Sequence, residues 1–228
     1  MGTYLITGAG RGIGRELVRV LLARGDYVIG TVRDLSRCPP EWAPFKDGGQ
    51  LDVLSLDVRD GRSIAEAAMI VSGPIDVLVN NAGIIGPERQ STLNMDFDGF
   101  LDTLAVNTLG PLRVIQAFLP HLRRASSGRI VTISSRMGSL SYAKSDRIAY
   151  RASKAAVNKV MQGLATDLRN DDITVVSVHP GWVQTEMGGS GADISVEESA
   201  GGIVRLIDRL TLEETGGFFD WQGMRLPF

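Results

Sequence analysis

Cysteine is almost absent from this sequence, which excludes one class of stabilising bond. Cys38 is the single cysteine among 228 residues, so no disulfide can form within the chain. Chains of this kind are typical of reducing compartments. Cys38 stands beside Pro39 and Pro40, with no histidine or helix start next to it. We therefore interpret it as a loop residue and not as a reactive thiol.

The sequence also lacks an excess of charge and any segment that resembles an address or an anchor. The formal net charge is −2 and no basic run stands out, so the electrostatic footprint of a nucleic-acid-binding protein is missing. Residues 1–14 join a short apolar run to a glycine cluster, which has neither the charge layout nor the length of a targeting segment. We expect a cytoplasmic protein without a nucleic-acid or membrane partner.

What the sequence does contain is an alternation of short apolar runs and longer helical patterns. Apolar residues make up 43% and charged residues 22% of the chain, which is typical of a globular protein. We predict strands at 4–7, 27–32, 51–56, 77–79, 129–134, 174–179 and from 218, and helices at 13–24, 63–71, 97–124, 150–170 and 195–210.

Strands that alternate with helices predict a parallel sheet built from βαβ units. The strand runs are almost continuously apolar, as expected when helices cover both faces of the sheet. Residues 35–49 are rich in proline and glycine and are predicted to form a loop, after which the alternation resumes on the same scale. The sequence thus predicts one α/β domain over residues 1–228, a doubly wound parallel sheet of about seven strands with helices on both faces.

A glycine-rich loop joins the first predicted strand to the first predicted helix. Within Thr7–Gly14 the glycines follow the spacing T-G-x-x-x-G-x-G, which differs from G-x-G-x-x-G. Glycine permits a tight turn and a close approach to a pyrophosphate, and the helix N-terminus supplies free N–H groups. A plain turn would look similar, but the position in a βαβ unit favours a dinucleotide site. The predicted contacts are Gly8, Gly10, Arg11, Gly12, Ile13 and Gly14.

The end of the second predicted strand indicates which nicotinamide cofactor binds. An acidic residue there would bind the ribose 2′-hydroxyl of NAD, but the strand ends in Gly30–Arg33, and Asp34 comes only after the arginine. A guanidinium suits a 2′-phosphate because it is planar and always charged. Arg11 could reach the same phosphate, although both arginines could instead be solvated surface charges. We predict NADP(H) as the cofactor, with Arg33 and Arg11 at its 2′-phosphate.

Two further segments follow predicted strands. Asp57, next to Val58, could accept a hydrogen bond from an adenine amino group, cap the helix that begins near Ser63, or merely end the strand. Asn80–Gly83 contains the small residues and amides that suit a loop passing over a nucleotide, although a turn would look similar. We predict cofactor contacts at Asp57, Val58, Asn81, Ala82 and Gly83.

The predicted chemistry rests on a tyrosine and a lysine at the start of a helix. Tyr150 and Lys154 are four residues apart and share one helix face. The tyrosine pKa of about 10 is too high for a base at neutral pH, and a nearby ammonium lowers it. Ser135 follows the fifth predicted strand, where a hydroxyl can bind a substrate carbonyl, but it could also form a strand-ending turn. The pair alone would be weak support, because such spacing is common on surface helices.

Taken in order, these motifs resemble the short-chain dehydrogenase/reductase family over nearly the whole chain. The matching segments are Thr7–Gly14, Asn80–Gly83, Ser135, Tyr150–Lys154 and Pro180–Gly181. The resemblance implies a Rossmann-type sheet in which Tyr150 is the catalytic acid/base. It implies that Lys154 lowers the pKa of Tyr150 and holds the nicotinamide ribose.

The same resemblance implies roles for residues outside that pair. Ser135 orients the substrate carbonyl, with Ser134 as the alternative if the strand register is shifted by one residue. Asn107 supports a water relay to Lys154, and residues 179–185 wall the nicotinamide amide. The cofactor contacts implied in this last segment are Pro180, Gly181, Val183 and Thr185, in addition to Tyr150 and Lys154. No metal site is expected.

Several segments are more similar to the C-factor and sniffer branch of carbonyl reductases within this family. They are residues 134–139, 149–154, 179–183, 186–189 and 216–221. The implied substrate is a small carbonyl or alcohol, whereas an NADP(H)-binding signalling or sensor protein with little turnover is the alternative. Ser135 and Tyr150 are 15 residues apart, so we expect the insert at 143–146 to bulge beside the site. Residues 186–194 are predicted to form a short, mobile lid over an open pocket.

The resemblance also implies an oligomer. Family members pair through helices that correspond to the one from Tyr150 and the long helix that ends at Arg124. Val157, Val160, Met161 and Leu164 could contribute to such an interface or could equally pack in the core. We expect a homodimer or homotetramer.

Overall fold

A seven-stranded, wholly parallel sheet forms the centre of the computed structural model, which describes residues 1–228. The strand order is β3-β2-β1-β4-β7-β8-β9, so the predicted doubly wound α/β fold is confirmed. The direction of winding reverses between β1 and β4, and ligands bind at such a switch point. The strands are β1 (Thr3–Ile6), β2 (Tyr27–Val32), β3 (Leu51–Ser55), β4 (Val77–Asn80), β7 (Arg129–Ile133), β8 (Thr174–His179) and β9 (Phe218–Asp220).

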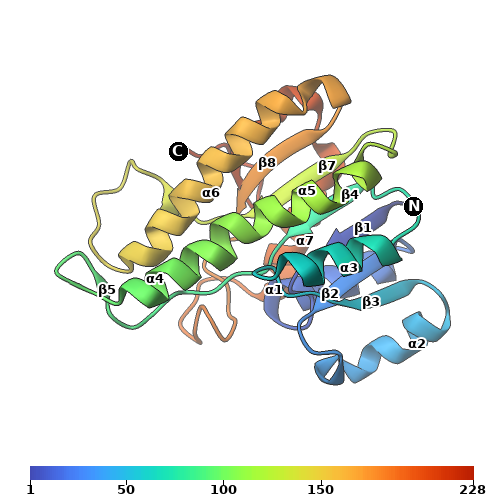
Figure 1. The fold of residues 1–228 in the computed structure, drawn as a ribbon, viewed down its shortest axis with the longest axis horizontal. Coiled ribbons are helices and arrows are strands. Elements are labelled where there is room, and N and C mark those ends of the chain that lie inside the picture. Colours follow the sequence, from blue (N-terminus) through green and yellow to red (C-terminus); the bar gives the residue numbers. More distant parts are fainter.

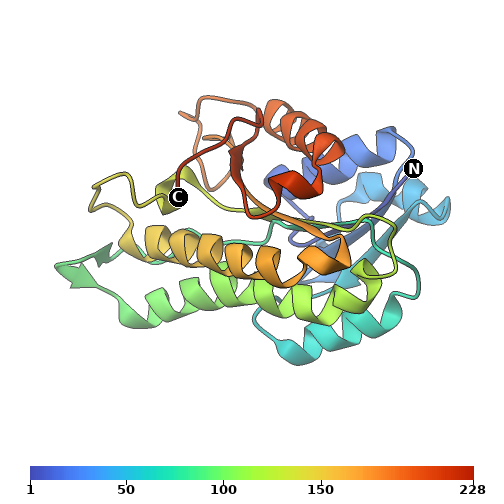
Figure 2. The ribbon, with the colours of Figure 1, turned by 90° about the horizontal axis from the view of Figure 1, so that it is seen from above.

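Helices cover both faces of the sheet, as Figures 1 and 2 show. One face carries α1 (Gly12–Ala23) and α7 (Val196–Arg209), and the other carries α3 (Gly61–Ile70), α5 (Gly110–Leu122) and α6 (Ile148–Asp167). Alternate residues of one strand serve the two layers: Val77 and Val79 pack on the first face, and Leu78 packs on the second. This double burial explains why the strands are continuously apolar.

The long helical stretch predicted at 97–124 is divided into three elements. It consists of α4 (Phe97–Leu104), a π-helical turn η3 (Ala105–Leu109) and α5. The wider turn holds Asn107 in a buried position between α4 and α6. Single π-helical turns of this kind are frequent at functional sites.

Several short elements were not expected from the sequence. The predicted loop at 35–49 contains η1 (Leu35–Arg37), η2 (Pro40–Trp42) and α2 (Ala43–Asp47), because Trp42 is buried against the core. A hairpin of β5 (Gln90–Ser91) and β6 (Asn94–Met95) projects from one end of the molecule (Figure 1). Three more 3-10 turns are η4 (Arg136–Gly138), η5 (Arg169–Asp171) and η6 (Leu212–Glu214).

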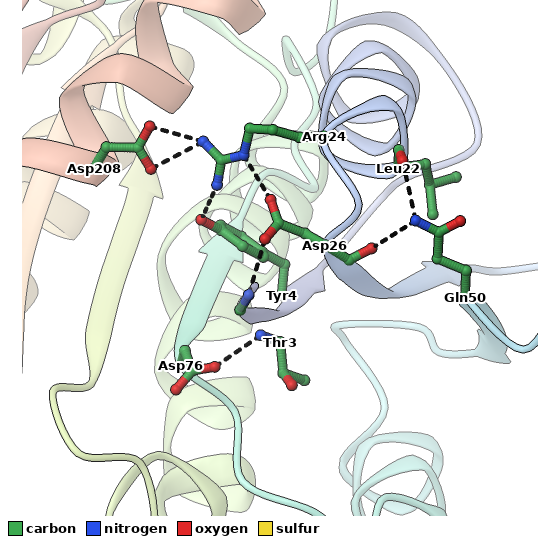
Figure 3. Close-up of polar contacts among 9 residues, drawn as sticks. Thr3, Tyr4, Leu22, Arg24, Asp26, Gln50, Asp76 and Asp208 are labelled. Atoms are coloured by element: carbon green, nitrogen blue, oxygen red, sulfur yellow. Dashed lines mark hydrogen bonds and ion pairs between the residues drawn. The ribbon is translucent and has the colours of Figure 1, made fainter.

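Arg24 organises the polar contacts at the amino ends of the strands, shown in Figure 3. Its guanidinium donates to Asp26 Oδ2 at 2.7 Å, to Tyr4 Oη at 2.8 Å and to both carboxylate oxygens of Asp208. Asp26 also accepts from the Gly2 amide at 2.8 Å, so this network joins β1, α1 and α7. These contacts lie at the amino ends of the strands, opposite to the carboxyl ends where a ligand is expected. They hold the strands in place and leave the carboxyl ends free.

None of the helices combines the length with the apolar character that crossing a membrane requires.

Candidate cofactor and active site

A cavity of about 660 Å³ lies at the carboxyl ends of the parallel strands. The loops after β1, β2, β3, β4 and β8 and the first turns of α6 contribute to its wall. Most of the residues predicted to contact the cofactor line this cavity. They are Gly8, Gly10, Arg11, Gly12, Ile13, Arg33, Asp57, Val58, Asn81, Ala82, Gly83, Tyr150, Lys154, Pro180 and Thr185.

Asn81 fastens the glycine loop to the loop after β4. Its Nδ2 donates to the carbonyl oxygens of Thr7 and Gly8, both at 3.0 Å. In return, the backbone amides of Asn81 and Ala82 donate to Thr7 Oγ1 at 3.0 and 3.1 Å. Gly8 has a φ of +65°, and a Cβ there would lie 2.9 Å from the Ala82 Cα. The two loops therefore form one rigid floor, and only glycine fits at position 8.

Gly14 serves packing and does not line the cavity. A Cβ at this position would lie 2.5 Å from both Asn81 Nδ2 and the Gly8 carbonyl oxygen. The glycine thus lets the start of α1 approach the loop after β4. This is the close helix packing that the last glycine of such loops provides.

The N-terminus of α1 is free to receive an anion. Arg11, at the N-cap, makes no side-chain capping bond, and the first turn contains no acidic residue. The first N–H groups of a helix have no partner within the helix, and the helix dipole favours negative charge at this end. Gly12 and Ile13 line the cavity at this point. The geometry fits a diphosphate group.

Four arginines line the part of the cavity between the glycine loop and β3. Arg33 makes no ion pair, Arg11 is paired with Glu186, and the Arg37 Nε lies 3.6 Å from Asp34 Oδ2. Arg37 was not predicted as a cofactor contact from the sequence. Its position one short turn after Arg33 is the sequence signal that could have identified it. Asp34, Asp57, Asp102 and Glu186 line the same cavity and pair with the other three arginines, so Arg33 is the one guanidinium there without an ion pair.

Asp57 is held by the fourth arginine, Arg59. Its carboxylate accepts from the Arg59 backbone amide at 2.9 Å and pairs with Nη2 at 2.9 Å, and this bonding lowers the pKa of Asp57. Arg59 also reaches Asp102 Oδ1 of α4 at 3.1 Å. The cap of α3 is Asp60, which accepts from the Arg62 amide. The alternative that Asp57 caps this helix is therefore wrong.

Lys154 carries its amino group into the interior of the protein. Nζ donates to the Ile133 carbonyl oxygen at 2.7 Å and lies 5.7 Å from the centre of the Tyr150 ring. Complete burial lowers the pKa of Lys154 to about 8, because the charged form has lost its water. The predicted pairing of the two side chains on one face of α6 is confirmed by these positions.

The pKa of Tyr150 shifts in the direction opposite to the one predicted. Burial raises it, whereas the hydrogen bond with the Ser135 side chain and the charge of Arg147 act to lower it. The Lys154 ammonium lies 5.7 Å from the ring centre and donates to the Ile133 carbonyl oxygen, and it makes no hydrogen bond to the phenol. The phenol of the protein alone is therefore protonated at neutral pH.

Ser135 and Ser134 have different surroundings. Ser135 lies close enough to Tyr150 for its side chain to lower the pKa of the phenol, and it accepts from the Met137 amide at 3.1 Å. The Ser134 hydroxyl is buried, and its one bond is a long one of 3.5 Å to the Lys154 carbonyl oxygen. Ser135 is thus the serine beside the tyrosine, whereas Ser134 is the serine that lines the cavity.

Asn107 joins two walls of the site. Its Oδ1 accepts from the Ile84 amide at 2.9 Å, and its Nδ2 donates to the Ile84 carbonyl oxygen and to Ser153 Oγ. It makes no direct bond to Lys154. A Cβ at Gly83 would lie 3.3 Å from Asn107 Oδ1 and 3.8 Å from Lys154 Nζ, so the glycine separates the two side chains.

The segment after β8 contributes less to the cavity than predicted. Gly181 and Val183 do not line it, because Gly181 packs against Ile194 and Val183 forms a bridge to the same residue. Residues 186–194 contain no helix, and Glu186 and Met187 line the cavity together with Thr185. Their predicted mobility stays a prediction.

Known proteins resemble this chain in both sequence and structure. The model of the short chain dehydrogenase family matches residues 3–193. The C-signal protein of Myxococcus xanthus is 44% identical over 166 residues, which cover 72% of this chain and 99% of that protein.

Two solved carbonyl reductases superpose over 100% of this chain, each at 32% identity. The NADPH-bound enzyme from chicken fatty liver has a TM-score of 0.93 and is covered to 99%. Sniffer of D. melanogaster has a TM-score of 0.94 and is covered to 100%. The predicted resemblance to the C-factor and sniffer branch is confirmed by these similarities.

Proposed function

The chain belongs to the short-chain dehydrogenase family, and from this premise we propose that it is an NADP(H)-dependent oxidoreductase acting on a small carbonyl or alcohol. The observation that carries the proposal is that Tyr150 and Lys154 line the same cavity as the glycine loop and the arginines, with Ser135 beside Tyr150. A cofactor cradle and a proton-transferring group at one crevice are the requirements of such a reaction.

The proposed cofactor is NADP(H), which supplies or accepts the hydride when it is bound. The free N-terminus of α1 would hold the diphosphate, and Arg33, Arg37 and Arg11 would hold the 2′-phosphate. The similar reductase from chicken fatty liver is a complex with NADPH. The proposal for this chain rests equally on its own arginines. The residue that directly follows β2 is Arg33 and not a carboxylate.

Tyr150 is the proposed proton donor to the substrate oxygen. Burial raises the pKa of its phenol, so the proton is present at neutral pH. Ser135 touches the same phenol and is placed to donate a hydrogen bond to a carbonyl oxygen there. A carbonyl is reduced only if its oxygen gains a proton as charge develops on it, and a positioned acid contributes 10²–10⁴-fold to such a step.

Lys154 is the proposed link between Tyr150 and solvent. Its pKa of about 8 leaves the ammonium charged at neutral pH and able to lose a proton with little cost. Asn107, across Gly83 from the ammonium, would support a water relay to it. We propose that this path returns a proton to Tyr150 after each turnover.

The second candidate is a protein that binds NADP(H) for signalling and turns over little. The 44% identity to the C-signal protein favours this alternative. A pure sensor has no need for a buried lysine and a serine arranged about a tyrosine, and burying a lysine is costly. The arrangement therefore favours the enzyme.

Turnover of NADPH with a panel of aldehydes and ketones tests the proposal. We expect the wild type to consume NADPH and Tyr150→Phe to lose at least about 10²-fold in kcat while still binding NADPH, since the phenyl ring preserves the packing. The same panel with NADH should be slower. Binding of NADPH with no turnover by either protein would support the signalling alternative.

A further inference from the structure

Gln90 is a buried side chain that joins the projecting hairpin to the site. It is only 7% exposed, although it begins the short strand β5. Its Nε2 donates to the carbonyl oxygens of Ile85 and Pro87, at 3.1 and 2.6 Å. Its Oε1 accepts from the backbone amide of Tyr150 at 3.1 Å. Both donor hydrogens and one acceptor position of the amide are therefore in use.

The helix that carries Tyr150 has no cap of its own. Its N-cap residue, Arg147, lies in the left-handed region with φ of +51° and makes no side-chain bond to the first turn. The first N–H groups of a helix need partners from outside it, and burial without partners is costly. Gln90, 60 residues away in the sequence, supplies the partner for the amide of Tyr150 itself.

The segment bound by Gln90 runs along the same cavity. Ile84 lines the cavity, and Asn107 binds both the amide and the carbonyl of this residue. Two amide side chains therefore link residues 84–87 to α6. Asn107 donates to Ser153 of this helix, and Gln90 accepts from the Tyr150 amide. Gly86 allows the tight wrapping, with φ of +88° and a Cβ position only 2.8 Å from Thr103 Oγ1.

We propose that Gln90 is a positioning residue, which fixes the position of Tyr150 relative to residues 84–87 at the wall of the cavity. This inference rests on the proposed function of Tyr150 as the proton donor. A proton is transferred efficiently only over a hydrogen-bond distance, so a small displacement of the helix start reduces turnover without changing cofactor binding. The hydrogen bonds of the Gln90 side chain go to Ile85, Pro87 and Tyr150, and none goes to the glycine loop or to the arginines of the cavity.

Gln90→Leu removes all three bonds with little change in volume, and Gln90→Glu keeps an oxygen for the Tyr150 amide while removing both donors. Ser91→Ala is the matched control, because Ser91 Oγ accepts from the Asn94 amide within the hairpin and makes no hydrogen bond to α6. The measurements are kcat and KM for a carbonyl, the Kd of NADPH, and hydrogen exchange of the Tyr150 backbone amide by NMR.

For Gln90→Leu we expect kcat to fall by about tenfold to a hundredfold, as a misplaced catalytic group predicts, with the Kd of NADPH within about twofold of wild type. The Tyr150 amide should exchange at least about tenfold faster, the effect of losing one hydrogen bond. Gln90→Glu should retain the amide protection and raise KM, because only the wall at 84–87 is released. Ser91→Ala should match the wild type in every measurement.

Wild-type kcat and wild-type amide exchange in Gln90→Leu would overturn the inference. Equal losses in kcat, NADPH affinity and thermal stability would also overturn it, because they would show that the residue only supports the fold. A wild type without turnover would refute the proposed function instead, and the exchange rate of the Tyr150 amide would still decide whether Gln90 holds the helix start.

Discussion

Lys154 bears a charge in a place where no carboxylate compensates for the loss of water. Its pKa falls from 10.5 to about 8, and burial is the cause. The folded state thus binds fewer protons than the unfolded state between these two values, and stability rises with pH across that window. Below pH 8 the whole cost of the buried ammonium remains, about 3 kcal/mol at 1.36 kcal/mol per pKa unit. A residue kept at such a cost is typical of a functional site.

Replacing Lys154 by an uncharged residue should abolish activity and stabilise the fold. We expect Lys154→Met to abolish turnover and to raise the free energy of unfolding at neutral pH by about 1–2 kcal/mol, less than the full cost because the Ile133 carbonyl loses its donor. The gain should shrink as the pH rises from 8 towards 10.5. Urea unfolding of both proteins at several pH values checks this. A variant less stable than wild type at neutral pH would contradict it.

Arg33 is the arginine of the crevice whose removal should affect the cofactor most selectively. It lines the cavity without an ion pair, whereas Arg11 and Arg37 already face carboxylates. Arg33→Ala should weaken NADPH binding by about tenfold or more, the usual worth of a charge-assisted hydrogen bond, and leave NADH binding unchanged. Fluorescence titration measures both. Arg62→Ala, at an exposed ion pair on α3, is the control, and an equal loss for NADH would refute the assignment.

At the scale of the element, α6 organises the candidate site because three other segments are hydrogen-bonded to its first turns. Gln90 binds the Tyr150 amide, and Arg151 reaches the Asp146 carboxylate and carbonyl at 2.8 Å. Arg151 also donates to the Met137 carbonyl oxygen at 3.4 Å, in the turn that follows Ser135. The insert predicted to bulge beside the site is thus anchored to α6 through its last residue, Asp146.

Arg151→Met should release this insert. We expect trypsin to cut after the exposed Lys144 about tenfold faster, because the loop has lost its charge-assisted bonds. Timed digestion with mass spectrometry of the fragments measures the rate. Arg62→Met, which breaks an exposed ion pair in the first turns of α3, serves as the control. An unchanged rate of cleavage would show that other contacts hold the insert.

At the scale of the whole molecule, an apolar surface on α4 lies exposed. Phe97 and Leu101 are one helical turn apart and are 73% and 64% exposed. Val157 and Met161 of α6 lie in the core, and Val160 and Leu164 pack against it, so these four residues are largely committed to the fold. If the chain forms the predicted homodimer or homotetramer, Phe97 and Leu101 are the side chains that would pair.

Leu101→Glu tests this association. We expect a wild type that is dimeric or tetrameric by light scattering at micromolar concentration, and a variant that is monomeric, because a buried carboxylate without a partner is costly. Met69→Glu places the same charge at a similarly exposed apolar position on α3 and should leave the assembly unchanged. A monomeric wild type would refute the predicted oligomer.

Local pattern determined most of the fold. The bounds of β2 and β8 agree with the prediction residue for residue, because both strands are apolar on each face and end at polar or glycine-rich segments. The glycine loop was also predictable, since its spacing and its place between a strand and a helix have a direct physical purpose. In contrast, the π-helical turn at Asn107 depends on contacts with Ile84 and Ser153, which no local pattern contains.

The sequence by itself determined the parallel sheet, the glycine loop and the placement of Tyr150 and Lys154 on one face of a helix, because these follow from periodicity and from side-chain type at fixed spacing. Only the tertiary structure decided that Ser135 lies beside the tyrosine, whereas Ser134 lines the cavity. It likewise decided that Gln90 accepts from the Tyr150 amide at the start of α6 and that burial raises the pKa of Tyr150. Desolvation and long-range hydrogen bonds depend on which distant segments surround a group, and that information is absent from any short stretch of the chain.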